Sequence, residues 1–312
     1  MISIVIPLYN KRETVVRALR SVLGQTVQDF DLVVIDDGST DGSVDIVKTF
    51  ADPRLRIIRQ PNSGVSAARN RGVAEAKTGF ITFLDADDEW LPTFIESIVA
   101  LREKLPECGL YSTSYFLQGV DGLRRERILN DVQVATGQIV LDDYFLIASQ
   151  SNSPVCSSAV AVFREDLLSV GGFPVGVKSG EDLLTWARLA ARKRVALVQR
   201  PLAVYHQDPA TVGGCPSRVP DPLDRVGTGL REILLSVPGH RRSSVRKYIG
   251  LWYKMRGSIY LRMGNHTKAI TECSKAFAFW PLNPKIHLLM LACVFPTRFI
   301  RWVRLRMEGK PS

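Results

Sequence analysis

Short apolar runs alternate with segments of helical periodicity over the first hundred residues of the chain. The apolar runs predict four strands, at residues 3–7, 31–36, 55–59 and 80–84. Between them, apolar residues at helical spacing predict helices at residues 13–23, 43–50 and 66–76. Because strands alternate with helices, we expect right-handed crossovers and a mostly parallel twisted sheet with helices on both faces, an α/β fold.

The alternation becomes less regular from residue 109 onward. Strands are predicted at residues 109–118, 158–163, 195–199 and 202–206, and helices at 142–148 and 181–193. Residues 209–222 contain the Gly and Pro residues typical of a linker. We therefore predict an α/β domain over residues 1–215, a connection over 216–242 and an α-helical C-terminal region over 243–312.

Aromatic and small residues recur at fixed offsets in the C-terminal region. Offsets 0, 4, 7, 11, 16, 23 and 28 are occupied by Tyr253, Gly257, Tyr260, Gly264, Ala269, Ala276 and Pro281. This spacing resembles one tetratricopeptide repeat, a helical hairpin with small residues where the helices touch. The resemblance departs at its first position, which is Tyr rather than Trp, and at Arg256, where Leu is usual. Because one repeat cannot bury both faces, we expect a helical appendage leaning on the α/β domain.

Composition excludes some classes of protein and leaves others open. A chain of 312 residues that is 46% apolar can bury a core, which excludes a disordered tail or a disulfide-stapled miniprotein. The net charge of +10 would suit nucleic acid, an anionic membrane or an acidic substrate. It is spread unevenly, because residues 1–208 carry −3 and residues 209–312 carry +13.

Cysteine usage and hydrophobic length predict a cytoplasmic location. The five cysteines are scattered, without a CxxC pair or metal-ligand spacing, which favours a reducing compartment. No basic leader precedes the first strand. The longest apolar run near the C-terminus has eight residues, whereas a membrane span needs about 20.

Polar side chains gather where three of the predicted strands end. Tyr9 follows the first strand, Asp36-Asp37 the second, and Asp85-Ala86-Asp87-Asp88 the fourth. Ligands of such sheets bind beyond the carboxyl ends of the strands. Asp85 and Asp87 suit one shared Mg²⁺ or Mn²⁺, because hard cations bind through one or two carboxylates when a diphosphate supplies more oxygens. The alternative is an acidic turn without a metal.

Four further positions allow both a structural and a chemical interpretation. Around Asp37 the alternatives are a turn that caps the next helix and a ligand contact. Arg69 lies one turn inside a helix whose N-terminus suits phosphate, or it pairs with an acidic loop. Glu181-Asp182 form an acidic helix cap or provide a general base. His206, at the end of the last strand, is a ligand or has no chemical role.

A series of motifs between residues 5 and 206 resembles the inverting family 2 glycosyltransferases of the GT-A fold. In chain order they are Ile6-Pro7-Leu8-Tyr9-Asn10, Ser21-Val22-Leu23-Gly24-Gln25-Thr26, Val34-Ile35-Asp36-Asp37-Gly38-Ser39-Thr40-Asp41-Gly42, Asn62-Ser63-Gly64-Val65-Ser66-Ala67-Ala68-Arg69-Asn70, Phe83-Leu84-Asp85-Ala86-Asp87-Asp88, Gly171-Gly172-Phe173 and Gly180-Glu181-Asp182. No single motif is specific, but the whole series in the family's order is. The resemblance implies a GT-A nucleotide-sugar-binding fold, to which the helical appendage is added.

The resemblance implies a nucleotide-diphosphate-sugar donor, a UDP-sugar by preference, at the carboxyl ends of the first strands. By motif position, Pro7, Tyr9 and Glu13 would line the pocket for the base and ribose. Asp37 would accept a hydrogen bond from the edge of the base. Arg69 would lie near the ribose or the diphosphate.

The motif Asp85-Ala86-Asp87 would provide the metal contacts of that donor. Asp87 would hold Mg²⁺ or Mn²⁺ across the diphosphate. Asp85 would contact the ribose or the metal, and Ala86 belongs to the same donor-binding segment. His206 matches a histidine that approaches the metal or the diphosphate in some members of the family.

Asp182, with Glu181 beside it, is the implied catalytic base. An acceptor hydroxyl would attack the anomeric carbon from the face opposite the leaving nucleotide, so the configuration inverts. The base removes the hydroxyl proton as the new bond forms, and the metal offsets charge on the departing diphosphate. We therefore expect a metal-dependent glycosyltransferase of cell-surface glycan biosynthesis, with a glycan or lipid-linked glycan as acceptor.

Two other classes of function are considered. A non-catalytic nucleotide-sugar sensor or scaffold would have degraded acidic motifs, but Asp85, Asp87, Glu181 and Asp182 are all present. Nucleic acid is not expected as a partner, because the basic residues are dispersed without a base-reading motif or a regular aromatic platform.

The C-terminal tail, residues 295–306, alternates arginines with apolar residues. This pattern suits an interfacial amphipathic helix on an anionic membrane. The alternative is a basic face whose apolar side packs on the preceding helices. We therefore expect a cytoplasmic protein, peripheral to the cytoplasmic face of a membrane if the first interpretation holds.

Overall fold

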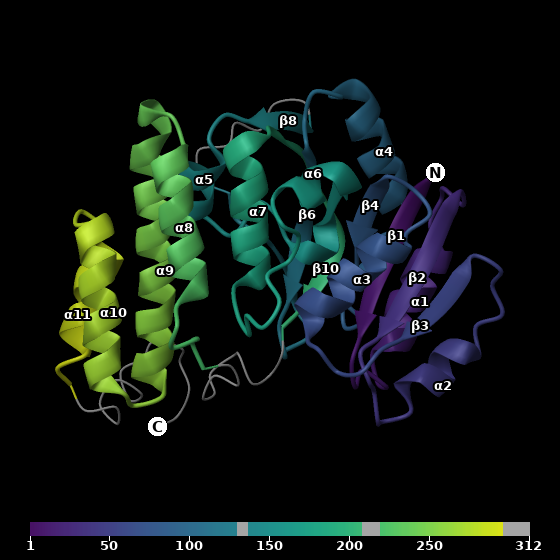
Figure 1. Cartoon of the computed structure of the whole chain (residues 1–312), viewed down its shortest axis with the longest axis horizontal. Helices are drawn as coiled ribbons and strands as arrows, with labels where there is room; N and C mark the ends of the chain where they lie inside the picture. The colour runs from purple at the N-terminus through teal and green to yellow at the C-terminus, as the bar shows by residue number, and fades with distance from the viewer. Residues whose placement is uncertain (130–136, 208–218, 296–312) are drawn as a thin grey trace. The chain divides into compact units, whose positions relative to one another are not determined.

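The computed structural model describes residues 1–129, 137–207 and 219–295 (Figure 1). The chain divides into two compact units, residues 1–208 and residues 209–312. Residue 215, the predicted end of the α/β domain, lies outside the described residues, as does the tail from residue 296. No helix within the described ranges combines the length and the apolar character needed to span a bilayer.

The first half of unit 1 confirms the predicted alternation of strands and helices. Its four strands are β1 (Ile2–Leu8), β2 (Phe30–Asp36), β3 (Leu55–Arg59) and β4 (Phe80–Phe83). They lie in the order β3-β2-β1-β4 and are parallel to their neighbours. Because these strands run parallel, their carboxyl ends lie at one edge of the sheet.

The second half of the sheet is mixed. It adds β5 (Glu89–Trp90), β6 (Leu110–Gln118), β7 (Arg124–Glu126), β8 (Gln138–Leu141), β9 (Val160–Phe163) and β10 (Val195–His206). β9 is antiparallel to β4 and β6, whereas β10 is parallel to β6 and antiparallel to β5 and β8. The strands predicted at 195–199 and 202–206 form one strand, β10, whose register shifts around Pro201.

Helices cover both faces of this sheet. They are α1 (Val15–Leu23), α2 (Ser43–Lys48), α3 (Val65–Glu75), α4 (Phe94–Lys104), α5 (Tyr144–Gln150), α6 (Arg164–Ser169) and α7 (Glu181–Arg192). Strand β1 is buried along its whole length. Ile4 and Ile6 belong to the core shared with α1 and α4. On the opposite face α3 approaches closely, because a Cβ added at Gly72 would lie 2.2 Å from Val5 Cγ1.

Unit 2 contains the predicted C-terminal helices. They are α8 (Arg225–Ser236), within the region predicted as a connection, α9 (Arg242–Arg262), α10 (His266–Phe279) and α11 (Pro284–Ala292). α9 and α10 pack closely, because a Cβ added at Gly257 would lie 2.7 Å from Cys273 Sγ. Gly264, in the turn between them, has a φ of +74°. The tetratricopeptide resemblance itself stays a prediction.

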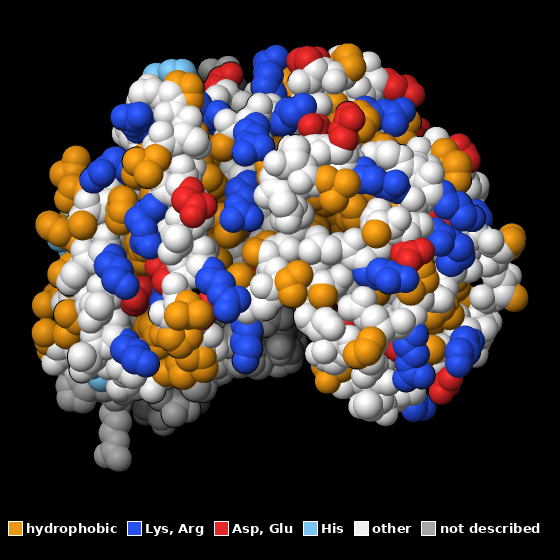
Figure 2. All heavy atoms as spheres, viewed as in Figure 1, with side chains coloured by type: hydrophobic (Ala, Val, Ile, Leu, Met, Phe, Trp, Pro, Cys, Tyr) orange, Lys and Arg blue, Asp and Glu red, His pale blue; other side chains and the backbone are white. Residues whose placement is uncertain are grey.

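Buried polar groups connect the helices of unit 2. Asp224 caps α8 and accepts hydrogen bonds from Trp252 Nε1 at 2.9 Å and Tyr253 Oη at 2.8 Å, both on α9. Arg256 of α9 donates through Nε to Glu272 of α10 at 2.5 Å. These hydrogen bonds give the buried polar residues of unit 2 a structural role. On the face drawn in Figure 2, Lys and Arg side chains are scattered over the described surface among apolar and acidic groups.

Candidate active site

The turn that follows β1 shapes one side of the site. Asn10 adopts a φ of +50°, a left-handed conformation that asparagine tolerates. Its N–H donates to Ser39 Oγ at 3.1 Å, and its Oδ1 accepts from Thr40 N–H at 2.9 Å. The turns after β1 and β2 are therefore joined. Beside them Tyr9 is 47% exposed, so its ring is open to a ligand.

Pro7 and Glu13 lie on either side of this turn. Pro7 is buried within β1, in register with Ile35 of β2. Glu13 is exposed just before α1. Of the three residues predicted to line the base and ribose pocket, Tyr9 and Glu13 are thus accessible, whereas Pro7 shapes the strand beneath.

Asp37 is buried at the end of β2 and organises the next loop. Its Oδ1 accepts from Gln60 Nε2 at 2.7 Å and from Ser63 N–H at 2.9 Å. Its Oδ2 accepts from Gly64 N–H at 2.8 Å, at the residue that precedes α3. Asp37 therefore does not cap α2, where Asp41 accepts from Ser43 N–H, but holds the loop 60–64 instead. A base contact would come in addition to these hydrogen bonds.

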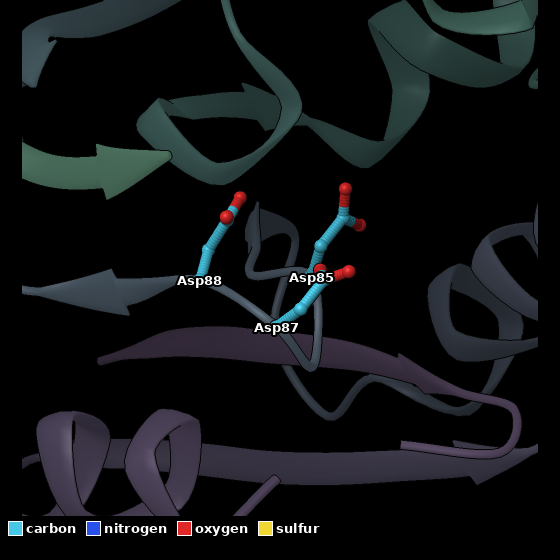
Figure 3. A group of neighbouring side chains, drawn as sticks. All are labelled: Asp85, Asp87 and Asp88. Carbon is cyan, nitrogen blue, oxygen red and sulfur yellow. The ribbon is translucent and has the colours of Figure 1, made fainter. Parts of the chain in front are cut away.

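Three carboxylates meet in the loop between β4 and β5. One oxygen each of Asp85, Asp87 and Asp88 lies within 4.8 Å of the others, and all three side chains project from this one loop (Figure 3). Ala86 is buried between them and its carbonyl accepts from Thr14 Oγ1 at 2.9 Å. Asp85 and Asp87 are the metal ligands predicted from the sequence, and the structure adds Asp88 to them.

Basic groups surround two members of this carboxylate cluster. Lys11 Nζ lies 2.6 Å from Asp87 Oδ2, and Arg17 donates to the Asp87 carbonyl. Arg69 Nη2 lies 2.7 Å from Asp85 Oδ1. Two of the negative charges of the loop are therefore paired, Asp87 with Lys11 of the turn after β1 and Asp85 with Arg69 of α3.

Asp88 is the most deeply buried of the three, at 1% exposed. Its Oδ2 accepts from Ser158 Oγ at 2.5 Å and its Oδ1 from His206 N–H at 2.9 Å. Burial, together with the negative charges of Asp85 and Asp87, raises the pKa of Asp88 well above its ordinary value. A divalent cation would relieve that repulsion, and carboxylate oxygens are the ligands that Mg²⁺ and Mn²⁺ prefer. The cluster therefore fits such a cation.

The ring of His206 lies beside this cluster without joining it, and its assignment to the metal stays a prediction. Its ring Nε2 lies 3.5 Å from a carboxylate oxygen of Glu89. Burial and the charge of Arg17 lower the pKa of the ring despite the opposing effect of Glu89. The residue reaches the cluster through its backbone N–H instead, because the side chain at the end of β10 is directed at β5.

Arg69 connects the cluster to the N-terminus of α7. Its side chain is 3% exposed and lies between Asp85 and Glu181, with Nη1 at 3.4 Å from Glu181 Oε1. The guanidinium carbon Cζ of Arg69 lies 5.3 Å from the ring centroid of Phe173, which belongs to the predicted Gly171-Gly172-Phe173 turn. Burial alone would lower the pKa of Arg69, but Asp85 and Glu181 raise it, so the side chain stays a cation. Both alternatives considered for Arg69 place it at this site, and the carboxylate pairing is present.

Asp182 and Glu181 differ in their surroundings. Glu181 is buried, whereas Asp182 is partly exposed. Asp182 Oδ1 accepts from Leu183 N–H at 2.7 Å, and its Oδ2 lies 3.5 Å from Ser157 Oγ. Both residues begin α7 after Gly180, which has a φ of +82°. Asp182 is therefore the carboxylate of this pair that a bound molecule can reach.

Some residues of the site could not be predicted from the sequence, because only long-range folding brings them there. Lys11 and Asp87 are 76 positions apart, and Ser158 and Asp88 are 70 apart. A signal was available for Asp88, because it continues the acidic run after β4. None of the local patterns distinguishes Ser158 from other serines of its segment.

Comparison with known proteins identifies the family. A family model for glycosyl transferase family 2 matches residues 3–171, more than half of the chain. An uncharacterized glycosyltransferase of Escherichia coli, YibD, is 40% identical over 171 residues, covering 54% of this chain and 49% of its own length. The putative teichuronic acid biosynthesis glycosyltransferase TuaG of Bacillus subtilis is 27% identical, covering 61% of this chain and 71% of its own. The chain spans half or less of several other curated relatives.

Solved structures share the fold. TarS residues 1–349 of S. aureus, in complex with UDP-GlcNAc, has a TM-score of 0.67 at 17% identity, covering 99% of this chain and 92% of that one. The mannosyltransferase PcManGT of Pyrobaculum calidifontis, in complex with GDP-Man and Mn²⁺, has a TM-score of 0.57 at 19% identity, covering 94% and 79%. Together with the family model and the motifs, these structures lead to one conclusion: the chain belongs to glycosyl transferase family 2 and has the GT-A fold.

Proposed function

We propose that this glycosyltransferase moves a sugar from a UDP-sugar to an acceptor hydroxyl with inversion, in a single displacement that depends on a divalent cation. The observation that carries the proposal is the position of Arg69, which contacts Asp85 of the carboxylate cluster and Glu181 beside Asp182. A diphosphate at the cluster and a base at α7 would then face the same reacting centre. One base is sufficient, because a single displacement needs no carboxylate nucleophile.

On the donor side, the carboxylate cluster would hold Mg²⁺ or Mn²⁺ through Asp85 and Asp87, with Asp88 completing the site. When bound, such a cation offsets negative charge on the departing diphosphate. Tyr9, which is exposed at the end of β1, would contact the base. Pro7 and Glu13 would shape the same pocket, and Asp37 would contact the base from the loop that it holds.

On the acceptor side, Asp182 would remove the proton from the attacking hydroxyl. Its partial exposure supports this role, because a base must come within hydrogen-bond distance of its substrate. Glu181 would act indirectly, since it is buried and paired with Arg69. A positioned base typically contributes about 10²–10⁴ to the rate.

The acceptor is proposed to be a cell-surface glycan or lipid-linked glycan. Support comes from the relative TuaG, which is described as a putative teichuronic acid biosynthesis glycosyltransferase. We place the reaction in the cytoplasm, at a membrane surface. Support for the membrane is the arginine pattern of residues 295–306 and the charge of +13 over residues 209–312.

The test is a transfer assay with a panel of nucleotide-sugars in Mn²⁺, repeated with a chelator. We expect a UDP-sugar to be consumed, with activity lost on chelation and restored by Mn²⁺. Asp182→Asn should lower turnover by about 10²–10⁴ while the affinity for UDP stays unchanged. Activity that survives chelation would contradict the metal, and near-normal transfer by Asp182→Asn would contradict the base.

A further inference from the structure

Ser158 lies between two members of the carboxylate cluster. It is the central residue of the short 3₁₀ helix η1 (Ser157–Ala159) and is 1% exposed. Its hydroxyl donates to Asp88 Oδ2 at 2.5 Å and accepts from Asp85 N–H at 3.1 Å. One hydroxyl group thus contacts the side chain of Asp88 and the backbone of Asp85.

The surroundings of Ser158 fix this hydroxyl in place. Trp90 Nε1 donates to the Ser158 carbonyl at 2.6 Å, which ties η1 to β5. Asp88 has its other oxygen bound by His206 N–H at 2.9 Å, so each carboxylate oxygen accepts one hydrogen bond. Because Asp85 and Asp87 repel the Asp88 carboxylate, its orientation depends on these two donors.

We propose that Ser158 is a positioning residue for the divalent cation, holding Asp85 and Asp88 in the arrangement that binds it. The inference rests on the proposed function, because it needs a cation at the cluster. Groups that hydrogen-bond to metal ligands orient them, and their loss typically weakens metal binding by about 10–100-fold. Ser158 would contribute in this way without touching the cation itself.

Mn²⁺ binding measured directly tests the proposal without relying on catalysis. Free Mn²⁺ is followed by its electron paramagnetic resonance signal while it is titrated into the full chain with UDP present. We expect Ser158→Ala to weaken Mn²⁺ binding by about 10–100-fold. Ser157→Ala is the matched control, because Ser157 is equally buried in η1 but lies against Asp182 rather than the cluster. It should leave the Mn²⁺ affinity unchanged.

A double-mutant cycle with Asp88→Asn shows whether Ser158 acts through Asp88. If it does, Ser158→Ala adds little to the loss already caused by Asp88→Asn, so the two losses do not multiply. Should Ser158→Ala fail to fold, Ser158→Cys replaces the hydroxyl by a thiol, a weaker hydrogen-bond donor, and must also bind Mn²⁺ more weakly than the unaltered protein.

The outcomes separate this inference from the proposed function. If the unaltered protein binds no Mn²⁺ in the presence of UDP, the proposed metal site is contradicted, and so is the role of Ser158 that depends on it. If the unaltered protein binds Mn²⁺ and folded Ser158→Ala binds it equally well, the role of Ser158 alone is overturned. Losses that multiply fully in the cycle overturn the action through Asp88.

Discussion

Replacing Arg69 by methionine removes a cation that contacts Asp85 and Glu181 at the same time. Methionine keeps an unbranched, flexible stem but lacks the guanidinium, so the change mainly removes charge and hydrogen bonds. The Arg69 side chain is 3% exposed and that of Glu181 is 6% exposed. The variant therefore leaves a buried carboxylate without the cation that now lies beside it.

Burial sets the expected magnitude of this change. Removing one partner of a buried ion pair typically costs about 3–5 kcal/mol, because the remaining charge has lost its water as well as its partner. The lost contact with Asp85 adds less to the destabilisation, since the Asp85 side chain is 27% exposed and water can replace the contact. The contact of the guanidinium with the Phe173 ring contributes about 1 kcal/mol. We expect Arg69→Met to lower the free energy of unfolding of unit 1 by about 3–5 kcal/mol.

Urea denaturation of the full chain at pH 8 measures this loss. Arg71→Met is the matched control, because Arg71 lies on the same helix and pairs with Glu75, but its side chain is 53% exposed. Exposed pairs at this spacing contribute about 0.3–0.5 kcal/mol, so the control should differ little from the unaltered protein. Adding Glu181→Gln to Arg69→Met should restore part of the loss, since it neutralises the carboxylate left behind.

Two results would refute this reasoning. One is a loss of less than about 1 kcal/mol for Arg69→Met, which would mean that the ion pair behaves like a surface pair. The other is an equal or larger loss when Glu181→Gln is added, which would mean that Glu181 is not destabilised by the missing cation.

Three further predictions concern the charge, packing and metal contacts of unit 1. Burial alone would raise the pKa of Asp31, but hydrogen bonds from Arg56 and from the N–H of Lys77 lower it. Asp31→Asn should therefore lower the free energy of unfolding by about 1.5–3 kcal/mol at pH 7. This difference in stability should vanish as the pH falls from about 4 through the pKa of Asp31 in the folded protein, which is lower. Thermal midpoints measured over a pH series test this, and a difference between variant and unaltered protein that persists unchanged at pH 2 would contradict it. Gly72→Ala should lower the melting temperature, because the new Cβ would lie 2.2 Å from Val5 Cγ1 and overpacking costs about 1–3 kcal/mol, more than the helix propensity gained; an unchanged value would contradict the close approach. The position of the His206 ring beside Glu89 favours an unchanged Mn²⁺ affinity for His206→Ala in the titration with UDP. A loss of about 10-fold or more would instead support the role as a metal ligand that the sequence predicts.

Strands buried on both faces could be predicted from the sequence with little error. β1, β2 and β4 are largely apolar and buried along their whole length, and a fully buried parallel strand needs apolar residues on both of its faces. β3, at the edge of the sheet, is only partly buried. β5 and β7 were missed because they have two and three residues, too few to show a period. The four-residue strand β8 was missed as well. The break predicted at 200–201 is a register shift within β10, which pairing with β6 bridges. Local patterns thus report burial but not which strands pair.

The chemistry of the site divides in the same way. The residue types at the ends of the strands could be predicted from the sequence, because side-chain identity and periodicity are local properties. Long-range folding is needed to bring Arg69 to Glu181 across 112 positions, Ser158 to Asp88, and the ring of His206 to Glu89. Those contacts depend on the order of the strands and the close packing of α3, which many distant residues fix together. The carboxylates are encoded locally, and their partners are set by the fold.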